Sequence, residues 1–468
     1  MLFNHCYVNN SICTPSRAAI LTGTHSHVNG VMTLDHNINN LIPMVHKHLK
    51  HGGYQTAFIG KWHLGEGAAH CPRGFDHWEA LPDQGVYYDP LFINNEGSYV
   101  EKGYVSDIIT DKTIDFVRNA DKEKPYFLMC HHKAPHRPWQ CDPKHKDLYT
   151  EDIRVPETFD DDYKHRAQAA AAAKMRVAED MTYTDLGLAQ PEGGEEVGEI
   201  GQPTVAGLDD RKVPHPEDVS SMVLVDKESG EKYRFESASN LRHFKYQRYV
   251  KRYCRTVHSI DVNVGRLLDY IDTLGADVIE NTMVIYTSDQ GFFLGDHGWF
   301  DKRFIYEESF QMPFLVRYPR EIKAGSICND IISNVDFAPT WLDLAGYPKP
   351  SYMQGRSFRT LLRGETPRDW QKVAYHRYWM HNDSPHECRA HYGVRDQRYK
   401  IIYWYNKDFG LAGTHPGGEP PEWELFDCQN DPLELLNQYN NPEYADVVRH
   451  MQVSLEAKMS EIGDIWEH

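Results

Sequence analysis

The sequence predicts an α/β fold: a large, mainly parallel mixed sheet sandwiched by helices, followed by a smaller C-terminal antiparallel α+β subdomain. Short apolar runs bounded by turn signals alternate with segments of helical periodicity, which is typical of parallel sheets. After about Thr366 the pattern changes to closely spaced strand-like segments. The 468 residues are enough for one large domain and a smaller one. We therefore predict a large domain over residues 1–365 and a subdomain over residues 366–468.

Four strand-like runs and two amphipathic segments support the predicted large domain. The runs are "YQTAFIGKWH", "PYFLMCHHKAPH", "NTMVIYTSDQGFFLGDHG" and "MPFLVRYP", and the helical segments are "YVSDIITDKTIDFVRNA" and "VHSIDVNVGRLLDYIDTLG". In the first three runs a polar cluster follows the apolar residues. Because the carboxyl ends of parallel strands meet at one edge of a sheet, we expect these clusters to converge there.

Residues 165–243 interrupt this alternation. The helix-forming "AQAAAAAKMRVAED" is followed by an acidic, Gly- and Pro-rich stretch that is poor in apolar residues. We interpret residues 165–243 as a long surface excursion with a small hairpin at "SMVLVDKESGEKYRFES". In the C-terminal part, "HYGVRDQRYKIIYWY" and "EWELFDCQNDPLELLN" predict antiparallel strands, and "NPEYADVVRHMQVSLEAKMSEI" predicts a closing helix.

Composition excludes several classes of partner. The formal net charge is −18, which argues against a general nucleic-acid or anionic-membrane surface. No stretch approaches the roughly twenty apolar residues of a membrane-spanning helix. Nine cysteines without tight spacing do not form a disulfide framework, and neither a CxxC pair nor a HExxH helix occurs. The opening "MLFNHCYVNN" lacks the features of a signal peptide.

The segment "CTPSRAAILTG" carries the strongest chemical signal. Thr14 and Pro15 fit the start of a helix, which places Cys13 at a helix N-terminus, where the unpaired N–H groups favour negative charge. Arg17, four residues on, projects back toward Cys13. One interpretation is an anion site with a reactive cysteine, and the other is a capped helix with a half-buried thiol.

This segment closely resembles the signature of the type I sulfatases, members of the alkaline-phosphatase-like superfamily. The resemblance continues in order through "GYQTAFIGKWHLG", "HHKAPHRPW", "TSDQGFFLGDHGWFDKRFIYEES" and "PFLVRYP", and it covers most of the chain. Within the family, the sequence looks most like bacterial N-acetylglucosamine-6-sulfatases and mucin-desulfating enzymes. The resemblance implies a sulfuric-ester hydrolase that acts on a sulfated carbohydrate.

The resemblance also implies a catalytic group and its supporting residues. A maturase would oxidise Cys13 to formylglycine, an aldehyde whose hydrate attacks sulfur and later releases sulfate as the aldehyde reforms. By motif position, Arg17 and Lys61 would steady this group and His63 would hydrogen-bond one of its hydroxyls. His136 would contact the sulfate or help protonate the leaving oxygen, and Lys302 would bind sulfate. His131 and His132 are left open between the site and packing behind the strand.

A calcium ion is the second implied cofactor. Asp289 and Gln290 follow an apolar strand and are hard oxygen ligands suited to Ca²⁺, together with the oxygen made from Cys13. The family's other two ligands are an Asp-Asp pair on a first strand that this sequence does not show. We therefore expect this chain to be inactive or poorly folded, and a longer parent, periplasmic or secreted, to be a sulfatase.

Residues that select the substrate are only weakly indicated. Asp296 and His297 lie just past the predicted metal ligands, and His391 and Arg395 lie on a predicted C-terminal strand that would close the pocket. Two alternative functions remain. One is a phosphonate monoester or phosphodiester hydrolase of the same superfamily, and the other is an inactive remnant that binds sulfated glycans through Arg17, Lys61 and Lys302.

Overall fold

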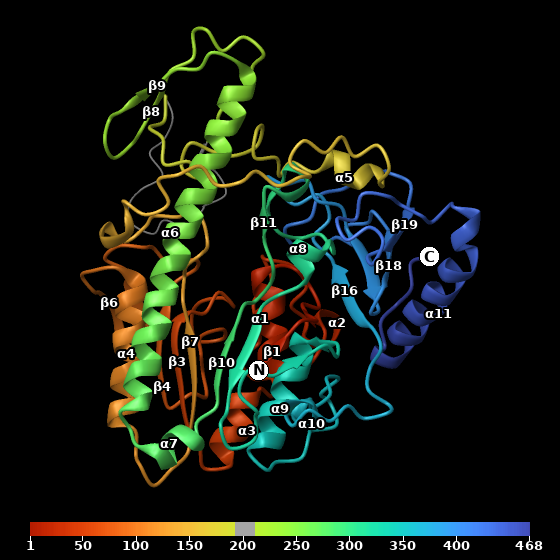
Figure 1. Cartoon of the computed structure of the whole chain (residues 1–468). Coiled ribbons are helices and arrows are strands. Elements are labelled where there is room, and N and C mark those ends of the chain that lie inside the picture. Colours follow the sequence, from red (N-terminus) through yellow and green to blue (C-terminus); the bar gives the residue numbers. More distant parts are fainter. Residues whose placement is uncertain (192–210) are drawn as a thin grey trace.

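A computed structural model describes residues 1–191 and 211–468, and it has the predicted α/β architecture with a C-terminal subdomain (Figure 1). In place of one continuous large sheet, the main part contains a five-stranded and a four-stranded sheet. The C-terminal part contains a separate antiparallel sheet. The predicted fold class is confirmed, although most strands of the second sheet are short.

The five-stranded sheet has the strand order β6-β5-β4-β3-β7. Its central strands β4, β3 and β7 run parallel, and β5 and β6 continue the sheet antiparallel. Helices α4 and α6 pack against each other along this sheet (Figure 1), and α4 contacts both β3 and β7. The strands and helices are β3 (Gln55–Lys61), β4 (His77–Leu81), β5 (Leu91–Asn94), β6 (Gly97–Val100), β7 (Tyr126–His131), α4 (Val105–Asn119) and α6 (Ala238–Asp272).

The four-stranded sheet has the order β10-β13-β1-β14, and its strands are β10 (Val284–Thr287), β13 (Phe314–Arg317), β1 (Leu2–Phe3) and β14 (Ile327–Cys328). Strand β13 runs antiparallel to both β10 and β1, and β1 runs parallel to β14. Phe3 holds the sheet to the core through edge-to-face contacts with Phe314 and Phe358. Within the described residues, β7 pairs only with β3 and β10 only with β13.

All ten residues of helix α1 (Cys13–Thr22) are buried. Gly23 ends the helix in the left-handed region (φ 67°), which a residue with a side chain adopts reluctantly. Helix α1 contacts α2 (Ser26–Asn29), α3 (Val45–His51) and α9 (Phe337–Leu344). A helix enclosed on every side fixes its first residue rigidly, and that residue is Cys13.

The C-terminal part is a four-stranded antiparallel meander packed against one helix, as predicted. Strands β16 (Ala374–Tyr378), β17 (His391–Arg395), β18 (Tyr399–Trp404) and β19 (Glu422–Asp427) pair in chain order. Helix α11 (Ala445–Ile462) packs Met451, Leu455 and Met459 against this sheet in a hydrophobic core of its own. The boundary between residues 365 and 366 stays a prediction.

The predicted surface excursion over residues 165–243 is wrong for much of its described length. Residues 167–188 are largely buried and join the main hydrophobic core, and the segment includes α5 (Gln168–Ala172). The small alanine, valine and methionine side chains there pack closely despite the low overall hydropathy of the region. The predicted hairpin is present as β8 (Leu224–Val225) and β9 (Lys232–Tyr233). The acidic centre, residues 192–210, lies outside the described residues.

The remaining elements are short connections. They are β2 (Cys6–Tyr7), η1 (Pro143–His145), α7 (Ala276–Glu280), β11 (Phe293–Leu294), η2 (Asp296–Gly298), β12 (Phe300–Asp301), α8 (Glu307–Phe310), β15 (Ile332–Ser333), η3 (Asn334–Asp336), α10 (Arg359–Leu362) and η4 (Pro442–Tyr444). All nine cysteines are free. Among the residues that the structure describes, no helix is both long and apolar enough to cross a bilayer.

The core between α11 and its sheet gives a test of the C-terminal packing. Leu455 is fully buried in this cluster, whereas Val453 on the same helix is 59% exposed. We expect Leu455→Ala to lower the free energy of unfolding by about 2–5 kcal/mol, because it removes buried methyl groups and leaves a cavity. Urea denaturation measures the loss. The control Val453→Ala should change stability by less than about 0.5 kcal/mol, and equal effects would contradict this packing.

Candidate active site

Cys13 is the first residue of α1 and is 1% exposed. The Lys61 ammonium lies 3.9 Å from its Sγ, and the Gln290 amide nitrogen lies 3.6 Å from it. Lys61 ends β3, and Gln290 follows β10, so the two contacts come from different sheets. The thiol is therefore held between the carboxyl ends of two strands and a helix start.

Charge makes this buried thiol acidic. Burial alone would raise its pKa, but the cations Lys302 and Lys61 outweigh burial and lower the pKa of Cys13 to about 5. A negative group at this position is thus stabilised by the protein's field. The structure places Cys13 in an anion-stabilising environment. Of the two interpretations of the motif, this environment favours the anion site over the capped helix with a half-buried thiol.

Arg17 lies one turn further along α1. Its guanidinium group hydrogen-bonds to residues at or just beyond the ends of three strands. Its Nε donates to Asp289 Oδ2 at 2.8 Å, and one terminal nitrogen donates to the Lys61 carbonyl at 2.6 Å and lies 3.1 Å from His131 Nδ1. Burial raises the pKa of Asp289, but Arg17, Lys61 and Lys302 together hold it below its ordinary value. The predicted convergence of the three polar clusters is therefore realised around one guanidinium group.

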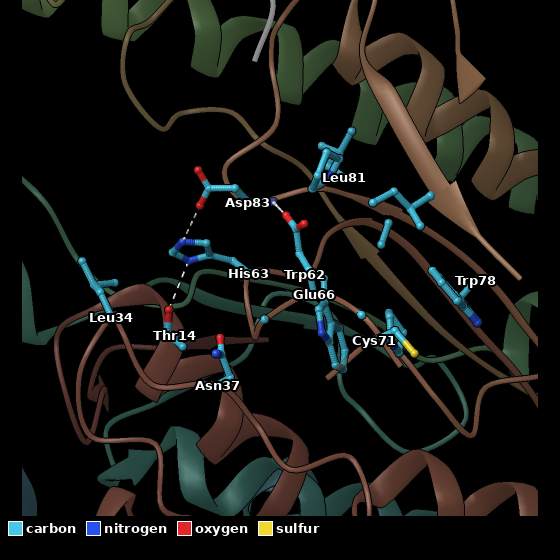
Figure 2. A pocket seen from close by; sticks show the side chains of 16 residues that line it. Thr14, Leu34, Asn37, Trp62, His63, Glu66, Cys71, Trp78, Leu81 and Asp83 are labelled. Atoms are coloured by element: carbon cyan, nitrogen blue, oxygen red, sulfur yellow. Dashed lines mark hydrogen bonds and ion pairs between the residues drawn. The ribbon is translucent and has the colours of Figure 1, made fainter. Parts of the chain in front are cut away.

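His63 lies beside the start of α1, at the end of the β3 segment. Its Nδ1 is 3.3 Å from Thr14 Oγ1, and its Nε2 is 3.3 Å from Asp83 Oδ1 (Figure 2). The Gln84 amide nitrogen also lies 2.8 Å from Nε2. Its backbone is in the left-handed region (φ 53°), which turns the ring away from the strand toward α1. Partners on both ring nitrogens fix the orientation of His63.

Lys302 approaches Cys13 from β12. Its ammonium pairs with Asp301 at 2.8 Å, and Asp301 in turn pairs with Arg303 at 3.1 Å and His386 at 3.0 Å. Burial lowers the pKa of Lys302, but Asp301 and Cys13 raise it above its usual value. Lys302 is thus a permanently charged group whose position is set by a buried ionic network.

His131 ends β7, and the loop that follows supplies Lys133 and His136. Burial, reinforced by Lys61 and Lys302, holds the pKa of His136 well below its ordinary value. Burial and Arg17 lower the pKa of His131 to about 3, so this ring is neutral and accepts from the guanidinium group. Of the two histidines left open, His131 belongs to the site. His132 faces Cys130, with its Nε2 3.7 Å from that sulfur.

A cavity of about 320 Å³ opens beside His63. Thr14, His63 and Asp83 form one part of its lining (Figure 2), and Thr14 follows Cys13 in the chain. The remaining wall is mostly apolar and aromatic, with residues such as Trp62, Trp78, Leu34, Leu81 and Ile93. A chamber of this size near a thiol in an anion-stabilising environment is suited to a small organic group that carries an anion.

The two residues proposed as calcium ligands, Asp289 and Gln290, supply only a few oxygen donors. Asp289 supplies carboxylate oxygens, and the buried Gln290 Oε1 has no hydrogen-bond partner within the described chain. Ca²⁺ takes six to eight oxygens. Among the described residues, no group of three or more His, Cys, Asp or Glu side chains could hold a metal ion. The oxygens of Asp289 and Gln290 are of the type that calcium binds, but they are too few to hold the ion by themselves.

The four residues predicted to contact the substrate lie in surroundings that differ from the cavity beside His63. His297 is 0% exposed, pairs with Asp161 at 3.1 Å and lies 3.7 Å from Glu308. His391 is equally buried, and its Nε2 accepts from the Ile305 backbone N–H. Packing on all sides argues against a contact between either ring and substrate. The sequence indicated these histidines because they lie near the motifs along the chain. Closeness to a motif does not reveal whether a side chain is buried.

The other two candidates are also engaged. Arg395 donates to Glu307 at 3.0 Å and lies over the Tyr7 ring. Asp296 is half-buried, and burial together with Glu308 raises its pKa. Neither residue lines the cavity beside His63.

Sequence reasoning missed three residues that the structure brings to the site. Thr14 stands inside the quoted motif but was interpreted only as part of a helix start. Lys133 stands between the predicted histidines and is 3% exposed. Asp83 reaches His63 from the loop after β4, and no local pattern in the sequence indicates this contact.

Comparison with known proteins identifies the family. Residues 1–347 match the sulfatase family model, and residues 295–461 match the model of the C-terminal region of N-sulphoglucosamine sulphohydrolase. The chain belongs to the sulfatase family and is a sulfate-ester hydrolase of the type I class. This confirms the resemblance in the sequence.

One relative and two solved structures illustrate the similarity. The chain is 40% identical to N-acetylglucosamine-6-O-sulfatase of Bacteroides thetaiotaomicron over 99% of this chain and 80% of that protein. A solved structure in complex with its substrate, D-glucosamine-2-N,6-O-disulfate, is 40% identical, with a TM-score of 0.84, covering 99% of this chain and 90% of that one. The phosphonate monoester hydrolase of Agrobacterium radiobacter shares the fold, with 18% identity and a TM-score of 0.66, over 98% and 88% of the two chains.

The ion pairs of His297 predict a pH-dependent stability. Burial lowers its pKa, but the carboxylates of Asp161 and Glu308 outweigh burial and raise it to about 9. A raised pKa stabilises the fold fully below pH 6.5, and this contribution is lost as the pH rises through 9. The loss in unfolding free energy caused by His297→Gln should therefore shrink by roughly 3 kcal/mol between pH 6 and pH 9.5. Urea denaturation at both pH values measures it, and a pH-independent loss would contradict the assigned charge.

Proposed function

We propose that this sulfatase removes a sulfate group from a sulfated glucosamine, with the 6-O-sulfate of N-acetylglucosamine as the preferred ester. The name of the 40% identical relative and the substrate bound in the 40% identical solved structure support this substrate class. The observation that carries the proposal is the placement of Cys13, which is buried at a helix start between Lys61 and Lys302 and beside a cavity of about 320 Å³. The cations would receive the sulfate, and the cavity would receive the sugar.

Formylglycine made from Cys13 by a maturase is proposed as the nucleophile. The surroundings of Cys13 suit this group, because the charges that lower the thiol pKa also stabilise an oxyanion at the same atom position. The hydrate of the aldehyde would supply covalent catalysis with a second hydroxyl for release of sulfate. An unmodified thiol has no second hydroxyl with which to release the sulfate.

The side chains around Cys13 have separate roles in the proposed reaction. Lys61 and Lys302 neutralise charge on the sulfate oxygens, since both ammonium groups face Cys13. Arg17 holds Asp289 and the end of β3 in place. His63 orients the attacking group from its position between Thr14 and Asp83, and His136 borders the same cationic cluster.

Calcium dependence stays a prediction that rests on the family resemblance, with Asp289 and Gln290 as the proposed ligands. A periplasmic or secreted location for a longer parent, and the partner maturase, stay predictions on the same ground.

A cysteine substitution tests the proposed nucleophile. Cys13→Ala should lower kcat on 4-nitrophenyl sulfate by at least roughly 10⁴-fold, because the covalent route is removed. The mass of the tryptic peptide that carries Cys13 should show an aldehyde in place of the thiol in the wild-type protein. An unconverted thiol together with glycan binding and no turnover would instead favour the remnant hypothesis.

Paired substrates test the reaction class. We expect kcat/KM for 4-nitrophenyl sulfate to exceed that for a phosphate or phosphonate ester of the same phenol by more than tenfold (about 1.4 kcal/mol). The two esters share a leaving group, so the ratio reports only the transferred group. A ratio in favour of phosphorus would support the phosphonate or phosphodiester alternative.

A further inference from the structure

The ring of His63 is held between helix α1 and the loop after β4 by contacts on its two nitrogens (Figure 2). Nδ1 lies 3.3 Å from Thr14 Oγ1, and Nε2 lies 3.3 Å from Asp83 Oδ1. Thr14 follows Cys13 at the start of α1, so the Nδ1 side of the ring faces the helix end that carries the proposed nucleophile. The Nε2 side faces the loop of Asp83.

Both members of the His63–Asp83 pair have left-handed backbone conformations. The φ angle is 53° at His63 and 44° at Asp83, which is uncommon for residues other than glycine. The backbone N–H of Asp83 donates to Glu66 Oε1 at 3.1 Å, and this contact holds the loop beside the ring. Residues keep such conformations where the surrounding contacts require them. The fold itself therefore turns these two side chains toward each other.

The charge of Asp83 bears on which nitrogen of His63 carries the hydrogen. In a neutral imidazole one nitrogen donates and the other accepts. An ionised carboxylate only accepts, so it favours the hydrogen on Nε2. The Thr14 hydroxyl both donates and accepts, and it therefore fits either state of Nδ1. With the hydrogen on Nε2, Nδ1 has a lone pair that faces the start of α1.

Gln84 competes with Asp83 for the same ring nitrogen. Its amide nitrogen lies 2.8 Å from His63 Nε2, and an amide nitrogen only donates, so this contact requires a lone pair on Nε2. That state would set the lone pair against the Asp83 carboxylate. The buried Gln84 Oε1 has no hydrogen-bond partner within the described chain, so no contact of that oxygen fixes the amide group. A half-turn of the amide presents Oε1 to Nε2, and both neighbours then favour the hydrogen there.

We propose that Asp83 is a positioning residue that holds the hydrogen of His63 on Nε2 and leaves Nδ1 as an acceptor toward residue 13. This inference rests on the proposed sulfatase reaction. As sulfate is released, Nδ1 takes the proton of a hydroxyl on residue 13, and the O–H electron pair forms the C=O bond. The electron pair of the breaking C–O bond leaves with the sulfate, and His63 then returns a proton to water. A carboxylate behind a histidine base fixes the same hydrogen arrangement in other hydrolases.

Moving the carboxylate between neighbouring positions tests the proposal. Asp83→Asn removes the charge and keeps the left-handed backbone, which Asn tolerates. We expect it to lower kcat on 4-nitrophenyl sulfate at least about tenfold and to change KM less than about twofold, because the ring loses its orienting charge while the cations at Cys13 stay. Adding Gln84→Glu places a carboxylate on the other neighbour of Nε2, and this double variant should recover most of the lost kcat. A loss caused by disturbed folding would not be repaired in this way.

The nitrogen chemical shifts of His63 give a readout that does not depend on turnover. In ¹⁵N-histidine-labelled protein above neutral pH, the wild type should show a protonated Nε2 and an unprotonated Nδ1. Asp83→Asn should show a mixture of the two neutral forms. The variant His63→Gln assigns the signals, because it removes them from the spectrum.

Asp89→Asn is the matched control. Asp89 also has a left-handed backbone (φ 47°), but it pairs with Lys102 and does not line the cavity. This variant should leave kcat and the His63 signals unchanged. A kcat loss below about tenfold in Asp83→Asn, no recovery in the double variant, or a hydrogen on Nδ1 in the wild type would overturn the positioning role. Wild-type turnover tests the proposed function separately, and the chemical shifts test the role of Asp83 even without turnover, so the two failures are distinguishable.

Discussion

The guanidinium group of Arg17 is the contact on which the rest of the site depends. It is buried on α1 and reaches the Lys61 carbonyl, His131 and Asp289, which stand at or just beyond the ends of β3, β7 and β10. Strands β7 and β10 lie in different sheets and do not pair with each other in the described chain. Charge-assisted hydrogen bonds from one fixed fork therefore hold the two sheets in register at the site.

A second constraint is the local reversal of charge. The protein as a whole carries a formal net charge of −18, yet the neighbourhood of Cys13 gathers the cations Arg17, Lys61 and Lys302. Burial would normally disfavour such a cluster. Asp289 and Asp301 offset part of the repulsion, and the remaining positive field lowers the pKa of the thiol to about 5. This field is what an incoming sulfate ester would meet.

The sequence predicted the strands and their convergence well because both follow from local patterns. Apolar runs ended by polar residues mark β3, β7 and β10. The parallel pairing of β3 with β7 brings Lys61 and His131 to one edge, and Arg17 links them to Asp289 from the other sheet. The same reasoning failed where burial decides the outcome. His297 and His391 follow chemical motifs but lie in packed aromatic surroundings. The core segment at residues 167–188 was missed because small side chains give a weak hydropathy signal.

The sequence by itself determined the family, the reactive cysteine and the helix that presents it, because the motif residues lie within one or two turns of each other. Only the tertiary structure decided which distant groups meet that cysteine. The pairing of His63 with Asp83 and the Asp301 network behind Lys302 both join residues through packing between separate elements. Side-chain burial and charge balance at such contacts depend on the whole fold, and no local pattern in a single chain encodes them.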